Sequence, residues 1–199
     1  MDPHAFLRTR RSIRRFTPEP IPDAALERMF ATAACAPSAH DRQPWRFCAV
    51  RSAEARSRLA DAMAADFRRD LAQDDLPAEE VAARVARSRS RIQESPVVIV
   101  LCMDLSDMDV YPDRRRQEAE RVMAIQSTAA AGLQLLLAAH AEGLAGVWTC
   151  GPLFAPDTVR TALGLAAAWE PQAMFLIGHP AREPKARQSR PLEDIVKWS

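Results

Sequence analysis

The chain has 199 residues, of which 48% are hydrophobic and 27% charged, and its formal net charge at pH 7 is +1. This composition is typical of a soluble globular protein, and we expect a single domain over residues 1–199. The near balance of 27 basic and 26 acidic residues argues against a dedicated nucleic-acid-binding protein, which carries a marked basic excess. The four cysteines and four histidines lack metal-ligand spacing, so the sequence predicts no metal site and four buried free thiols.

The first fifty residues predict two helices and a strand. A short helix is expected over residues 3–11 and a second over 20–36, where Asp23 is placed to cap the helix and apolar residues recur at helical spacing. The segment 44–50 has the alternation of a strand.

The remaining elements alternate between helices and strands. Charged, alanine-rich helices are expected over 53–72 and 78–92, the second with Asp75 as a cap signal. The other expected elements are a buried strand over 95–103, a long helix over 115–141, a short helix over 155–165, and two strands within 145–151 and 171–180. About four strands interleaved with five or six helices indicate an α/β or α+β fold, and element order alone leaves the strand directions open.

The long helix contains a stretch, residues 122–141, without Asp, Glu, Lys or Arg, and its length approaches that of a membrane span. Many of its apolar residues are alanines and several others are polar, which favours a buried helix of a soluble protein or dimer. The N-terminus lacks the apolar core of a signal peptide. We therefore expect a cytoplasmic protein without a membrane partner.

A cluster of five arginines lies in the sequence RTRRSIRRF, residues 8–16. In an extended chain, the side chains of Arg10, Ser12 and Arg14 point to one side. Those of Arg11, Ile13 and Arg15 point to the opposite side. Two guanidinium groups flanking a hydroxyl suit a terminal phosphate dianion. The alternative is a solvated basic surface.

Other catalytic and nucleotide-binding motifs are missing from the sequence. The six glycines form neither a G-x-G-x-x-G nor a phosphate-binding loop with lysine, so side chains must hold any phosphate. No serine-based triad is evident. Cys150, in WTCGP, is interpreted as a small buried residue beside a turn rather than as a nucleophile.

Three further stretches carry possible binding groups. The loop APSAHDRQPWRF, residues 36–47, offers donors and acceptors suited to a heteroaromatic edge, or is an ordinary polar connection. The sequence GVWTCGP, residues 146–152, allows a ligand to approach the backbone closely, or simply ends a strand. The tail adds a second basic group, Lys185 and Arg187, or is an exposed charged segment.

Together these stretches resemble the flavin-dependent nitroreductase family over essentially the whole chain. The motifs RRSIRRF, APSAHDRQPW, GVWTCGP and IGHP followed by K-A-R occur in the order of that family and at roughly its spacings. The resemblance implies an α+β fold, an α/β/α sandwich whose central, mostly antiparallel sheet is flanked by helices. It also implies an intertwined homodimer with the long helix in the interface and FMN bound where the subunits meet.

The resemblance also implies site residues. Arg10, Ser12 and Arg14 would hold the FMN phosphate together with the basic tail, and residues 37–39 would come from the partner subunit. Gln43 and the backbone of residues 150–152 would face the flavin ring. The full expected set is Arg10, Arg11, Ser12, Arg14, Pro37, Ser38, Ala39, His40, Gln43, Cys150, Gly151, Pro152, Lys185 and Arg187. No catalytic side chain is expected, because the flavin itself carries the hydride.

A narrower resemblance points to one subgroup. Residues 70–88, 111–120 and 169–181 are similar to the nitroreductase-like C-terminal domain of the bifunctional ligase that makes coenzyme F420. The ligase half is absent, so we expect either a stand-alone homologue or an excised domain. Asp41 stands where family members often carry Asn.

These observations leave three hypotheses. The leading one is an FMN-dependent reductase acting on a dehydro precursor of coenzyme F420, with NAD(P)H or reduced coenzyme F420 as electron donor or substrate. The alternatives are a general NAD(P)H-dependent nitro- or ene-reductase and a non-catalytic module that binds flavin or deazaflavin. The basic stretch 112–121 either meets an acidic substrate or is a solvated helix start.

Overall fold

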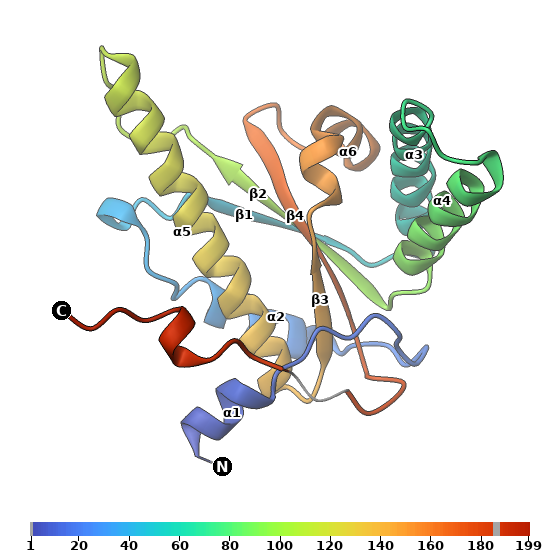
Figure 1. Ribbon diagram of the computed structural model, residues 1–199, viewed down its shortest axis with the longest axis horizontal. Helices are drawn as coiled ribbons and strands as arrows, with labels where there is room; N and C mark the ends of the chain where they lie inside the picture. The colour runs from blue at the N-terminus through green and yellow to red at the C-terminus, as the bar shows by residue number, and fades with distance from the viewer. Residues whose placement is uncertain (1, 185–187) are drawn as a thin grey trace.

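The computed structural model describes residues 2–184 and 188–199, which form a four-stranded sheet with helices on both faces (Figure 1). The strands are β1 (Trp45–Val50), β2 (Val97–Asp104), β3 (Ala145–Thr149) and β4 (Trp169–Gly178). They lie in the order β1-β2-β4-β3, and each neighbouring pair is antiparallel. The α+β sandwich with an antiparallel central sheet is therefore confirmed.

The helices lie close to their expected positions. They are α1 (Pro3–Thr9), α2 (Asp23–Ala33), α3 (Ala53–Leu71), α4 (Ala78–Gln93), α5 (Arg114–Ala141) and α6 (Pro156–Leu163), with short 3-10 turns η1 (Ala39–Asp41), η2 (Gly151–Phe154) and η3 (Leu192–Asp194).

Two expected helix caps are wrong. Asp23 lies inside the first turn of α2, where its carboxylate pairs with Arg51, and the N-cap position is Pro22. The N-cap of α4 is Pro77, without a side-chain hydrogen bond, so Asp75 does not cap that helix. In both cases the chain enters the helix from an extended proline, whose fixed φ suits a helix start without a capping oxygen.

Helices α5 and α2 cover one face of the sheet. Leu101 and Phe175 of the sheet pack with Leu135 of α5 in the larger hydrophobic core. A Cβ atom on Gly132 would lie 2.7 Å from the Trp148 ring and 2.9 Å from both Leu101 and Phe175, so α5 lies very close to the sheet. By length and composition α5 could cross a membrane, but half of its most apolar 18-residue stretch is buried inside the protein. The helix thus serves as a core helix here.

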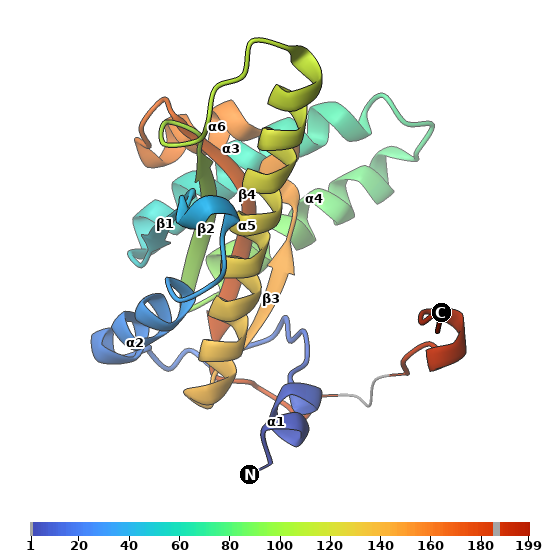
Figure 2. The ribbon, with the colours of Figure 1, turned by 90° about the vertical axis from the view of Figure 1, so that its left-hand side faces the viewer.

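Helices α3 and α6 cover the opposite face. Val98 and Val100 of β2 pack with Leu59 of α3 and Val159 of α6. Helix α4 packs against α3 through a small separate cluster that includes Val85 and Leu71. Figures 1 and 2 show α3 and α4 as a helical pair that projects from the sheet on the side opposite α5.

Candidate functional site

The arginine segment, residues 10–16, is attached to the edge strand β3 and to the end of β4. The backbone N–H of Ile13 donates to the carbonyl of Gly146 in β3 at 3.1 Å, and that of Thr17 donates to the carbonyl of His179 at 2.9 Å. Ser12 forms a parallel bridge with Gly146. These contacts place the arginines at one end of the sheet.

The chain beyond β4 returns along the arginine segment. The backbone N–H of Ala181 donates to the carbonyl of Arg15 at 3.1 Å, and Phe16 forms an antiparallel bridge with Pro180. Lys185 and Arg187, which the sequence analysis singled out, lie outside the described residues. Residues 180 and 181 of this tail therefore lie directly beside the arginine segment.

A cleft of about 1160 Å³ lies between the arginine segment, the C-terminal half of α4 and residues 181–184. Its charged lining residues are Arg10, Arg11, Arg14, Arg15, Arg87, Arg91, Arg182, Glu94 and Glu183. Seven arginines against two glutamates give this arginine cleft a formal excess of five positive charges. Guanidinium groups at such density are suited to a phosphate or another multivalent anion.

The arrangement within the segment differs from the expected alternation. Every residue from Arg10 to Phe16 lines the cleft, including Arg11, Ile13 and Arg15. The segment is joined to the sheet through isolated bridges at Ser12 and Phe16 rather than as a regular strand, so its side chains do not separate onto two faces.

His140, in the last turn of α5, anchors the helix that leads into the arginine segment. Its Nε2 lies 2.9 Å from the Thr9 hydroxyl, and its ring stacks on Phe6 with centroids 4.8 Å apart. Burial lowers the pKa of His140, and the charges of Arg10 and Arg11 lower it further. The imidazole therefore lies within the positive field of the candidate site.

The loop that contains Pro37, Ser38, Ala39, His40 and Gln43 lies beside the middle of α5, away from the arginine cleft (Figure 1). The backbone N–H of Ala39 donates to the hydroxyl of Ser127 in α5 at 3.1 Å, and that of Gln43 donates to the Ser38 hydroxyl at 3.1 Å. None of these five residues lines the arginine cleft of the same chain.

The backbone of this loop is strained. His40, Asp41 and Gln43 have φ values of 51°, 52° and 48°, a region that non-glycine residues rarely occupy. The Gln43 side chain donates to the Asp41 carboxylate at 3.0 Å. Strained residues of this kind concentrate at ligand sites, which supports a binding role for the loop.

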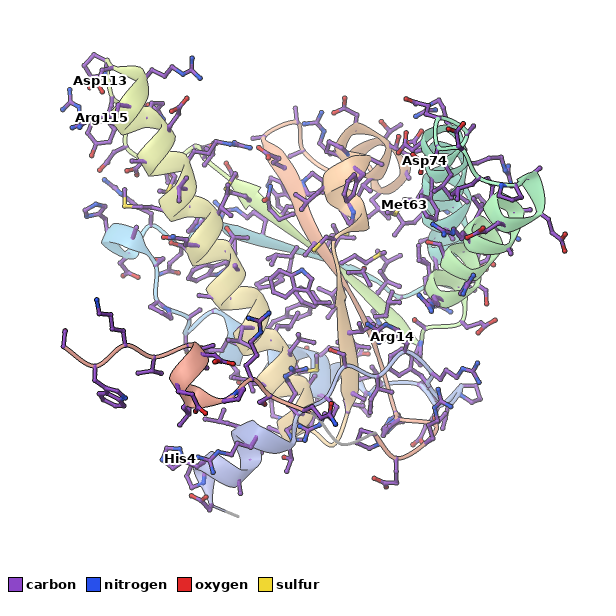
Figure 3. All side chains as sticks on the ribbon, in the orientation of Figure 1. His4, Arg14, Met63, Asp74, Asp113 and Arg115 are labelled. Atoms are coloured by element: carbon purple, nitrogen blue, oxygen red, sulfur yellow. The ribbon has the colours of Figure 1, made fainter. Side chains whose placement is uncertain are left out.

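The third expected stretch, residues 150–152, begins η2 just after β3. A Cβ on Gly151 would lie 3.0 Å from Cε of Met63, so a methionine of α3 borders this turn (Figure 3). Cys150 is exposed, contrary to the expected burial, because it lies at the start of the η2 turn after the last residue of β3 rather than within the strand.

The other cysteines are free thiols as expected, with different exposures. Cys102 is buried in β2, and burial raises its pKa to about 12. Cys48 is half-buried, whereas Cys35 lies exposed after the end of α2. The expectation of four buried thiols is therefore wrong for Cys35 and Cys150.

The basic stretch 112–121 is a solvated helix start. Arg114 pairs with Glu118 at 2.5 Å on the first turns of α5, and Arg121 pairs with Glu170 at 2.5 Å. Figure 3 shows Asp113 and Arg115 at the far end of α5 from Arg14. These arginines are thus separate from the cleft.

Sequence reasoning missed several residues around the cleft. Arg87 and Arg91 line it from α4, and Arg182 lines it from the tail. Arg87 and Arg91 are four residues apart, so they lie on one face of the helix. The same helix carries several other arginines, and the spacing alone does not distinguish these two from the rest.

Comparison with known proteins identifies the family and the fold. The sequence profile of the Nitroreductase family matches residues 7–179. The chain belongs to the nitroreductase family. It is an oxidoreductase of that family, as the sequence motifs indicated, and the matched range contains the arginine segment, the strained loop and the turn at Cys150.

Individual relatives cover almost all of this nitroreductase-family chain. An NADH dehydrogenase of Thermus thermophilus is 30% identical over 213 residues, covering 95% of this chain and 92% of its own. A 5,6-dimethylbenzimidazole synthase of Rhodospirillum rubrum is 33% identical over 188 residues, covering 90% and 82%. A nitroreductase of Desulfovibrio desulfuricans, solved in complex with FMN, is 27% identical with a TM-score of 0.75, covering 100% and 98%.

Proposed function

We propose that this nitroreductase-family enzyme binds FMN and uses NADH or NADPH to reduce a nitro or activated-alkene compound. The observation that carries the proposal is the arginine cleft, which lies where the family motif RRSIRRF meets the end of the sheet. The FMN complex of the D. desulfuricans relative and the name of the T. thermophilus relative support the two cofactors.

The chemistry of the cleft fits an FMN phosphate. A phosphate monoester carries about two negative charges at neutral pH and offers three acceptor oxygens. Arg10, Ser12 and Arg14 supply guanidinium and hydroxyl donors from one segment. The volume of about 1160 Å³ is ample for a small-molecule site. We propose that Lys185 and Arg187 complete this phosphate site.

The edge strand β3 sets the length of the proposed site. Ser12 is paired with Gly146 near the start of β3, and Cys150 lies four residues further along the chain, about 13 Å away for an extended strand. A ligand with a phosphate at one end and a ring system at the other suits this spacing. When bound, FMN supplies hydride acceptance and donation. The protein residues bind and orient it, and no acid–base pair of the protein is required.

We propose that a second subunit completes the site. The strained loop 37–43 lies on the α5 side of the molecule, away from the arginine cleft of its own chain. Helix α5 also exposes Val122, Ile125 and Leu133. A homodimer that buries this face would cover the apolar side chains and bring the loop to the partner's flavin. We further propose that the chain is a single cytoplasmic domain.

The relatives favour a nicotinamide donor over the deazaflavin chemistry that the sequence analysis put first. One of them is named for NADH and another for nitro reduction. Reduction of a coenzyme F420 precursor remains a prediction that rests on residues 70–88, 111–120 and 169–181 alone. Membership of an oxidoreductase family favours an enzyme over a non-catalytic flavin-binding module.

Anaerobic mixing of the purified, FMN-loaded protein with NADH, NADPH and reduced coenzyme F420 tests the proposal. We expect that NADH or NADPH reduces the flavin and bleaches its visible absorption. A nitroaromatic compound should then reoxidise the flavin and restore the absorption, over many turnovers. Bleaching by reduced coenzyme F420 alone would favour the deazaflavin hypothesis. Release of 5,6-dimethylbenzimidazole after oxygen is admitted to the reduced protein would instead assign the activity for which the R. rubrum relative is named.

A further inference from the structure

The arginine cleft holds more positive charge than one phosphate can neutralise. Its described lining carries a formal excess of five positive charges. The phosphate of FMN supplies about two negative charges. The remaining positive charge would attract a second anionic group to the same cleft.

Arg87 and Arg91 are the arginines that line the cleft from the side opposite the arginine segment. They lie one helical turn apart on α4, about 6 Å along its axis, and both are exposed. Within residues 2–184 and 188–199 neither forms an ion pair, whereas Arg84 and Arg89 of the same helix pair with Glu80 and Asp61. This leaves two adjacent guanidinium groups available to bind an anion.

A second hollow shares these two arginines with the cleft. It has a volume of about 520 Å³ and is lined by Phe67, Glu80, Arg84, Arg87, Ser88 and Arg91. Phe67, from α3, is half-buried against the α3–α4 cluster and gives the hollow an aromatic wall. An aromatic wall beside two neighbouring guanidinium groups suits a nucleotide. The base can stack on the aromatic ring while the guanidinium groups bind the phosphate.

We propose that Arg87 and Arg91 bind a phosphate of the nicotinamide dinucleotide, and that its adenosine occupies the hollow beside Phe67. The proposal rests on the proposed function, because it assigns the binding site of that reaction's electron donor. The phosphate is either the 2′-phosphate of NADPH or the pyrophosphate shared by NADPH and NADH. Arg87 and Arg91 are thereby residues that determine affinity for the donor, distinct from the arginines proposed for FMN.

The test compares the double variant Arg87→Gln/Arg91→Gln with the wild type, both loaded with FMN. Binding of adenosine 2′,5′-bisphosphate and of ADP is measured by calorimetry, and KM and kcat are measured with NADPH and with NADH. Arg89→Gln is the matched control, because it removes an arginine of the same helix whose pair with Asp61 is exposed and contributes little to stability.

We expect the double variant to bind the nucleotide at least about tenfold more weakly, with a matching rise in KM and unchanged kcat and flavin content. A loss confined to the bisphosphate and NADPH identifies the 2′-phosphate. An equal loss with ADP and NADH identifies the pyrophosphate.

Two results would overturn the inference. Unchanged nucleotide binding in the double variant would show that these arginines do not contact the donor, and loss of flavin would assign them to FMN instead. After either of these results, the proposed function still stands if NADH or NADPH reduces the flavin of the wild type. A wild type that no nicotinamide reduces would overturn both proposals.

Discussion

Phe16 lies directly against Gly178. A Cβ atom added to Gly178 would come within 2.7 Å of Cβ and 2.8 Å of Cγ of Phe16. Because the contact involves Cβ of Phe16 rather than a flexible side-chain end, only the missing side chain at the end of β4 allows the arginine segment to pass this close to the sheet. The contact thus joins the phenylalanine of RRF to the glycine of IGHP.

The substitution Gly178→Ala should therefore displace the arginine segment. Overpacking at such a site costs about 1–3 kcal/mol of stability, and the shift should also weaken FMN retention. Thermal unfolding and the flavin content after dialysis measure the two effects. Gly143→Asn is the control, because a Cβ at Gly143 meets no atom within 4 Å and asparagine tolerates its φ of 73°. Equal flavin content in both variants would refute the positioning role of Gly178.

The burial of His140 beside Arg10 predicts a pH dependence of stability. The folded protein keeps the imidazole neutral at a pH where the unfolded chain already protonates it, since the pKa of His140 is lowered by burial and by Arg10. The unfolded state therefore binds more protons below about pH 6.5. Stability should be fully present above that pH and should fall as the pH decreases through the lowered pKa. Denaturant unfolding across this range measures the effect, and His140→Gln should flatten it.

Binding of an anion at the arginine segment should raise the pKa of His140. The anion offsets the positive charges of Arg10 and Arg11, which now lower that pKa. An NMR titration of His140 with and without inorganic phosphate measures the change. In Arg10→Gln the pKa should already be higher without phosphate. Phosphate that binds without moving the His140 titration would place the anion elsewhere.

Thiol reactivity tests the proposed position of the flavin ring. Cys150 is exposed and Cys102 is buried with a pKa raised to about 12, so a maleimide should label Cys150 and leave Cys102 unmodified in the folded protein. Added FMN should slow labelling of Cys150 at least about tenfold if the ring covers this turn. Mass spectrometry after digestion assigns each site. Labelling of Cys150 at the same rate with bound FMN would exclude the turn from the flavin site.

Much of the fold could be predicted from the sequence. The β-branched run of β2 is buried along its whole length, and the uncharged stretch of α5 lies in the core, as their patterns indicated. The helix starts at Asp23 and Asp75 were placed less well, because extended prolines begin both helices. Strand direction required the family resemblance, since it depends on contacts between strands that are distant in sequence.

The candidate site was predicted in part. The arginine segment was identified because its charge density differs from the rest of a nearly neutral chain. Arg87 and Arg91 were missed because only the packing of α4 on α3 turns their helix face toward the segment. The strained loop carries only a weak sequence signal: His40 and Asp41 are residue types enriched at positive φ, but Gln43 is not, and glycine is absent from the loop.

The most direct test of the central claim is the flavin content of Arg10→Gln/Arg14→Gln, measured by visible absorption and by the mass of the molecule that heat releases. Arg114→Gln/Arg115→Gln, at the opposite end of α5, is the control that removes the same two positive charges. The wild type and the control should show two flavin bands and release FMN, while the double variant should lose most of it, with affinity at least about tenfold weaker. Full FMN content in the double variant would contradict the account, because the arginine segment would then not hold the cofactor.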